Sequence, residues 1–195
     1  MKNSALVIVD MLYDFIDGSL ACQNADNAVM ETLKFIDSKT GGQGGEEHEI
    51  LDMFPILFIR DHHPADHSSF KEQGGIWPSH CVAGTHGGEI HADLMPYAQE
   101  ELIFDKGCNQ AVEQYSGFEG VNCAGQSLGE ILELLDTTDV YVCGIATEYC
   151  VRNTCEDLHK AGFKVRLLKD CLAYVEHDGH LKALEEMHAE GISIE

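Results

Sequence analysis

The chain has 195 residues, a length that suits one α/β domain with a full core, so residues 1–195 are expected to form a single domain. Its formal net charge of −22 would repel nucleic acid phosphates and anionic membranes, which favours a small, neutral or weakly charged molecule as its partner. No apolar run is long enough for a bilayer span or a signal peptide core, so we expect a cytoplasmic protein whose eight cysteines are reduced thiols.

The first third of the chain predicts a strand, a helix and a second strand. Residues 5–9 are a continuous aliphatic run, typical of a strand buried on both faces, and the pattern of residues 24–38 predicts a helix. The glycine-rich, acidic residues 41–47 are interpreted as a mobile surface connection. A second strand is predicted at 56–60, followed by a long irregular segment at 62–94, and loops of that length are usually functional.

The remainder of the chain alternates strands with helices. Strands are predicted at 102–104, 140–143, 164–168 and 192–194, and helices at 128–135, 149–161 and 179–189. This alternation predicts a Rossmann-like, three-layer α/β/α fold, with a parallel sheet of about six strands and helices on both faces. In such sheets the ligand binds at the carboxyl ends of the strands.

Reactive side chains lie at these predicted strand ends. Asp10 follows the first strand, Lys106 the third, and Cys150 follows the strand at 140–143 and opens a helix, whose free N–H groups favour a thiolate and can hold an oxyanion. Taken singly, a solvated acid, a surface lysine and a core cysteine are each the commoner interpretation. Taken together, they form a plausible triad of base, electrostatic stabiliser and nucleophile.

Six of the eleven histidines fall between residues 62 and 91, which suggests a metal site. Asp61 and His63 are two residues apart on an extended segment and therefore point to the same side, and His80 is a candidate third ligand. Three protein ligands would leave coordination positions open, as in catalytic sites. The alternative is that these histidines only cover the surface of an acidic protein, and spacing alone leaves both interpretations open.

Five segments together carry a resemblance to a known family. They are ALVIVD at 5–10 with Asp14-Phe15, DHHPADHSSF at 61–70, WPSHCV at 77–82, Lys106-Gly107 with YSGF at 115–118, and GIATEYCV at 144–151. With them, residues 5–192 resemble the isochorismatase-like cysteine hydrolases, most closely their nicotinamidase/pyrazinamidase branch. The last segment is shared by the whole superfamily, whereas the Asp-x-His-Pro and Trp-Pro-x-His pair is typical of the nicotinamidases.

The resemblance implies an amidase that hydrolyses nicotinamide to nicotinate and ammonia through a cysteine thioester, in NAD salvage, with pyrazinamide as a further substrate. It also implies one divalent metal ion, zinc first, although iron and manganese suit the same ligands, and a chain able to form homo-oligomers. The implied site residues are Asp10, Lys106 and Cys150 as the triad; Asp61, His63 and His80 as metal ligands; Phe15, Trp77 and Tyr115 as pocket walls; and the N–H groups of Ala146 and Cys150 as the oxyanion hole, with a cis peptide between Ile145 and Ala146.

The chain departs from the family pattern at a few positions around the expected pocket. Leu12-Tyr13 replaces a usual Gln-Asn, His62 replaces a common tryptophan, and His86 replaces a frequent proline. His62 or His67 is a candidate fourth ligand, although outer or solvent-facing roles are favoured. Two other functions remain as alternatives: a related cysteine hydrolase acting on another amide or ureido compound, and a catalytically silent small-molecule sensor, against which the intact triad argues.

Overall fold

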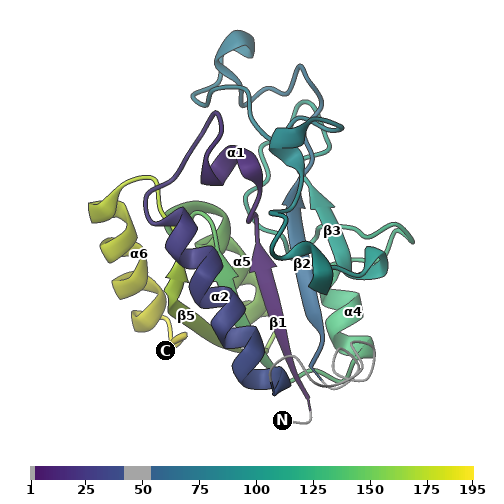
Figure 1. The fold of residues 1–195 in the computed structure, drawn as a ribbon, viewed down its shortest axis with the longest axis vertical. Coiled ribbons are helices and arrows are strands. Elements are labelled where there is room, and N and C mark those ends of the chain that lie inside the picture. Colours follow the sequence, from purple (N-terminus) through teal and green to yellow (C-terminus); the bar gives the residue numbers. More distant parts are fainter. Residues whose placement is uncertain (1–2, 42–53) are drawn as a thin grey trace.

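A computed structural model of the protein describes residues 3–41 and 54–195 (Figure 1). A six-stranded sheet, parallel throughout, has the strand order β3-β2-β1-β4-β5-β6. This confirms the predicted α/β fold. Most of the predicted glycine-rich connection, residues 42–47, lies outside the described residues. Among those described, no helix has both the length and the apolar character that crossing a bilayer requires.

All six predicted strands are present, with ends shifted by a few residues at most. The strands are β1 Ser4–Val9, β2 Ile56–Asp61, β3 Ile103–Lys106, β4 Asp139–Gly144, β5 Lys164–Leu172 and β6 Ser193–Ile194. The α-helices are α1 Tyr13–Ile16, α2 Ala25–Thr40, α4 Leu128–Leu134, α5 Arg152–Lys160 and α6 His177–Ala189.

Two of the differences from the sequence-based expectation concern helical segments that contribute residues to the site described below. The four-residue helix α1 was not predicted, because so short a segment has no detectable hydrophobic period. The helix expected at 149–161 begins two residues earlier as a π-helical turn, Thr147–Val151, and becomes α-helical only at Arg152. Single π-helical turns of this kind are frequent at functional sites.

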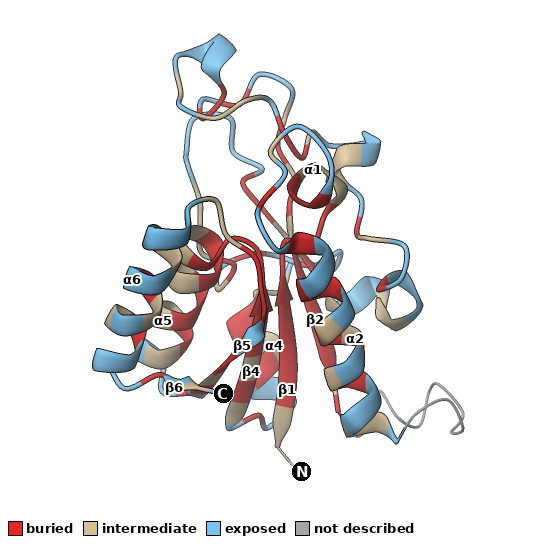
Figure 2. Ribbon diagram, turned by 60° about the vertical axis from the view of Figure 1, so that its left-hand side comes forward, coloured by how far each residue is buried: buried red, intermediate tan, exposed pale blue. Residues whose placement is uncertain are grey.

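The core lies on both faces of the sheet because the side chains of β1 alternate between them. Leu6 and Ile8 belong to the apolar cluster that includes the inner side of α2, whereas Val7 and Val9 belong to the cluster shared with α4, α5 and α6. Figure 2 shows the strands buried between helices whose outer sides are exposed. The continuous aliphatic run of β1 is thus explained by burial on both sides.

The irregular segment that follows β2 lies over the carboxyl ends of the strands, at the top of Figure 1. Strand register brings the functional side chains to this edge. Asp61 and Lys106 are paired partners at the ends of β2 and β3, and Asp10 comes one residue after Val9, which pairs with Ile59. The sheet thereby fixes the backbone positions of three of the predicted site residues.

A glycine at the end of β4 allows the chain to turn into the site. Gly144 has a φ of 128°, and a Cβ added there would collide with the backbone of Val9 in the neighbouring strand. We therefore expect Gly144→Ala to lower the free energy of unfolding by about 3 kcal/mol, through backbone strain and overpacking together. Denaturant unfolding would measure the change.

The matched control is Gly162→Ala. Gly162 has a φ of 98°, but a Cβ there would meet nothing within 4 Å, so it carries the backbone strain without the collision and should cost only about 1 kcal/mol. Equal losses in the two variants would contradict the steric argument.

Candidate active site

The buried ammonium group of Lys106 joins the polar groups at the strand ends. Its Nζ lies 2.9 Å from Asp10 Oδ2, 2.5 Å from Asp61 Oδ1 and 3.4 Å from Cys150 Sγ. All four side chains are buried. Burial alone would lower the pKa of Lys106, but the two carboxylates raise it by more. The net effect is a raised pKa, and Lys106 stays protonated. The structure thus brings together the three predicted triad residues.

The carboxylate of Asp10 has the environment of a proton acceptor. Asp10 has a φ of 50°, unusual for a residue other than glycine, and its Oδ1 accepts the N–H of Asp61 at 2.9 Å. Burial raises the pKa of Asp10 to about 6, against the opposing effect of Lys106. A carboxylate with a pKa near 6 is largely ionised at neutral pH and can still hold a transferred proton.

The thiol of Cys150 lies in the π-helical turn, next to its predicted base. Burial raises the pKa of Cys150 well above its usual value, although Lys106 opposes the effect, so the resting group is a thiol that needs a base. The Ile145-Ala146 peptide bond is cis, as the family resemblance implies. The N–H of Ala146 has no acceptor among the described residues, which leaves it available to an oxyanion.

A second set of buried groups adjoins the first through Asp61. One ligand atom from each of Asp61, His63 and His80 can be chosen so that all three lie within 4.8 Å of one another. His63 Nδ1 bonds the carbonyl of Gly107 at 3.0 Å, and its buried Nε2 has no hydrogen-bond partner among the described residues and lies 3.4 Å from Asp61 Oδ2. His80 Nδ1 bonds the carbonyl of Pro78 at 2.8 Å, which leaves Nε2 as its free nitrogen.

These residues fit a divalent metal ion by donor chemistry and by charge. Two imidazoles and a carboxylate are suitable ligands, and the backbone carbonyls orient both rings in the way typical of metal-binding histidines. Asp10, Asp61 and Lys106 together carry a net charge of −1 when all three are ionised, and they are buried. A nearby cation would therefore reduce the cost of burying this negative charge. Among the described residues, a second group of possible ligands is Asp10, Asp61 and Cys150, but these already surround the ammonium of Lys106.

Neither candidate fourth ligand joins this set. His67 is buried against His63, but its Nδ1 contacts Ser69 Oγ at 2.7 Å and its Nε2 contacts the carbonyl of Val112 at 3.2 Å. His62 is partly exposed, and its Nδ1 lies 3.9 Å from Asp105 Oδ2. The structure therefore agrees with outer roles for both histidines.

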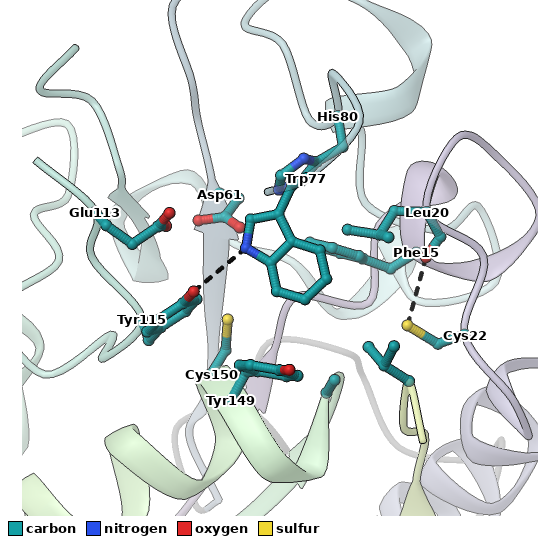
Figure 3. Close-up of a pocket in the computed structure, with 12 residues that line it drawn as sticks. Phe15, Leu20, Cys22, Asp61, Trp77, His80, Glu113, Tyr115, Tyr149 and Cys150 are labelled. Atoms are coloured by element: carbon teal, nitrogen blue, oxygen red, sulfur yellow. Dashed lines mark hydrogen bonds between the residues drawn. The ribbon is translucent and has the colours of Figure 1, made fainter. Parts of the chain in front are cut away.

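A pocket opens onto both sets of groups (Figure 3). The three predicted aromatic residues, Phe15, Trp77 and Tyr115, all line it, and the indole N–H of Trp77 donates to the hydroxyl of Tyr115 at 3.2 Å. Asp61, His80 and Cys150 face the same space. The full lining is Phe15, Leu20, Cys22, Asp61, Trp77, His80, Glu113, Tyr115, Ala146, Tyr149, Cys150 and Val175.

Several lining residues were not predicted from the sequence. Tyr149, directly before Cys150, packs edge to face with Trp77 at a centroid distance of 5.1 Å, and its position beside the nucleophile was a usable signal. Leu20, Cys22, Glu113 and Val175 come from segments without a distinguishing pattern and reach the pocket only through the tertiary fold.

The isochorismatase domain family matches residues 4–195, and the chain belongs to this family. One relative, the nicotinamidase/pyrazinamidase of Mycobacterium tuberculosis, is 34% identical over 97% of each chain. Among solved structures, the pyrazinamidase of Pyrococcus horikoshii in complex with zinc is 37% identical, with a TM-score of 0.82 over 99% of this chain and 98% of that one. PnC1 from L. infantum in complex with nicotinate is 30% identical, with a TM-score of 0.81 over 100% and 92% of the two chains.

The metal set can be tested by removing one ligand. His80→Ala would leave one carboxylate and one imidazole, so we expect zinc affinity to fall by at least about 100-fold, beyond the 10–100-fold typical of losing an outer partner. Elemental analysis after dialysis against buffered zinc would measure it. The matched control is His62→Ala, which should keep full metal content. Full occupancy in the His80 variant would contradict the ligand assignment.

Proposed function

We propose that the protein is a metal-dependent nicotinamidase, which hydrolyses nicotinamide to nicotinate and ammonia through a thioester on Cys150. Pyrazinamide would be a further substrate, and the reaction would serve NAD salvage. Residues 1–195 would form a single domain. The observation that carries the proposal is that one pocket is lined by Cys150, whose thiol lies beside Lys106, and by Asp61 and His80, which form a possible ligand set with the buried His63. The relatives that act on these amides or bind nicotinate support the choice of substrate.

The triad would divide the chemistry among its three side chains. Asp10 would accept the thiol proton as Cys150 Sγ attacks the carboxamide carbon, and would return a proton to the departing ammonia. Lys106 would hold the carboxylates in place and stabilise the developing thiolate at 3.4 Å. Asp10 would then accept a proton from the water that attacks the thioester, and would return it to the Cys150 sulfur as the C–S bond breaks. In comparable sites, one oxyanion donor such as the N–H of Ala146 contributes roughly 3–4 kcal/mol.

Asp61, His63 and His80 would hold the divalent ion. When bound, the ion supplies a positive, Lewis-acidic centre to which a ring nitrogen can bind directly or through water. The aromatic side chains would hold the flat ring of the substrate, because Phe15, Trp77 and Tyr115 wall the space between that end of the pocket and the thiol. A substrate held at both ends has its carboxamide placed for attack.

The charge of the pocket favours this substrate over ureido acids. Asp61 and Glu113 line the pocket, and none of the described lining residues is a lysine or arginine. Since the ammonium of Lys106 is already engaged by two carboxylates, a substrate carboxylate would find no free lysine or arginine among the described residues that line the pocket. A neutral amide is therefore the better match. The sensor alternative is disfavoured because binding alone needs no thiol beside a buried acid and an ammonium.

The direct test is ammonia release from nicotinamide by metal-loaded protein. We expect turnover by the unmodified protein and none above background by Cys150→Ala, which should still bind metal and nicotinate because it loses only the sulfur atom. Coupled ammonia detection would measure rates, and mass spectrometry after a rapid acid quench would look for the thioester. Residual turnover in the variant would overturn the nucleophile assignment.

The role of the ring nitrogen can be tested with analogues. Benzamide keeps the carboxamide but lacks the nitrogen expected near His80, so its kcat/KM should be about 30–100-fold lower than that of nicotinamide, equivalent to roughly 2–3 kcal/mol. Pyrazinamide, which keeps a nitrogen at the equivalent ring position, is the matched control and should stay within about tenfold of nicotinamide. Equal turnover of benzamide and nicotinamide would remove the basis for a metal-anchored ring.

A further inference from the structure

The π-helical turn that carries Cys150 is tied to the connection between β5 and α6. The backbone N–H and the hydroxyl of Thr147 both donate to the carbonyl of Ala173, at 2.9 and 3.0 Å. His180 Nδ1, in the first turn of α6, lies 2.9 Å from the same hydroxyl oxygen. Because the single hydroxyl proton points to Ala173, the hydrogen in the second contact comes from His180, which donates to Thr147.

This chain of hydrogen bonds is shielded and braced. Thr147 is fully buried, so water has no access to replace the histidine at the hydroxyl. The ring of His180 packs on Tyr174 at a centroid distance of 4.5 Å. The backbone of Tyr174 is in turn paired in both directions with Gln23, at 2.8 and 3.1 Å. Packing on Tyr174 therefore restrains the ring of His180 and the position of its Nδ1.

A neighbouring side chain docks the same turn to the same connection. Glu148 Oε1 accepts the N–H groups of Val175 and Glu176, at 3.0 and 2.8 Å. Val175 also lines the pocket. Thr147 therefore connects two parts of the site. Ala146, whose N–H has no acceptor among the described residues, directly precedes it, and Cys150 follows three residues later. The β5–α6 connection, to which Thr147 is hydrogen-bonded, also contributes Val175 to the pocket wall.

We propose that His180 is a positioning residue, which through the hydroxyl of Thr147 holds the Ala146 N–H and the Cys150 thiol where the tetrahedral intermediate requires them. The proposal rests on the proposed amide hydrolysis. His180 touches no reacting atom, and its effect belongs to the transition state rather than to substrate binding. Displacing catalytic groups by about 1 Å can cost on the order of 100-fold in rate.

The test compares two substitutions of His180 that differ in one donor. In His180→Asn the amide nitrogen can occupy the place of Nδ1, whereas His180→Leu has a similar branch without a donor. We expect kcat for ammonia release from nicotinamide to fall by about tenfold or more in the leucine variant, with KM changed by less than about twofold, and to be largely retained in the asparagine variant. His188→Leu, at an exposed position near the other end of α6, is the control and should keep the activity of the unmodified protein.

Two results would overturn the proposal: a kcat within twofold of the unmodified protein in His180→Leu, or an equal loss in His180→Asn. If the leucine variant does not fold, the acceptor side of the same hydrogen bond can be tested by comparing Thr147→Val, which lacks the hydroxyl, with Thr147→Ser, which keeps it. The rate of Cys150 alkylation by iodoacetamide, followed by peptide mass spectrometry, needs no substrate and should fall in the variants without the hydrogen bond and be retained in those with it. Absence of nicotinamide turnover by the unmodified protein would defeat the proposed function, and the alkylation rates would still decide the role of His180.

Discussion

The site depends on the ion pairs that the ammonium group of Lys106 forms with Asp10 and Asp61. This ammonium is a fully buried charge that contacts Asp10, Asp61 and Cys150, each from a different segment of the chain. Without Lys106, Asp10 and Asp61 would lose the ammonium that contacts both of them in the interior, at a cost of several kcal/mol. Asp61 gives one oxygen to Lys106 and turns the other towards His63, so the same carboxylate joins the proposed nucleophile site to the proposed metal site.

The relative position of these charged side chains depends on the order and register of the strands rather than on the length of any one strand. β3, β2 and β1 are consecutive neighbours, and their parallel register places Lys106, Asp61 and Asp10 at one edge. A shift of one residue in β3 would turn Lys106 to the opposite face of the sheet. The apolar side chains on both faces specify that register, so packing of the core is also what aligns the charges.

The strands and the residues at their ends were predictable because both follow from local pattern. An apolar run that stops at charged residues, as at Asp10 and at Arg60-Asp61, marks a buried strand and its exit towards a ligand. The lengths of the contacts around Lys106 were beyond that reasoning, since they depend on register between distant segments. The π-helical turn at Thr147 and the walls formed by Leu20 and Val175 have no periodic signal and arise only once the sheet, the turn and the β5–α6 connection pack together.

The charge balance of the pocket has a consequence for turnover. The substrate of the proposed reaction is neutral, but its product, nicotinate, is an anion that would form in a pocket lined by the carboxylates of Asp61 and Glu113. An anionic product in this pocket meets repulsion from these carboxylates that the neutral amide does not meet. The protein's own charges therefore disfavour the product relative to the substrate. Asp61, His63 and His80 would hold a divalent ion whose positive charge would offset part of this repulsion.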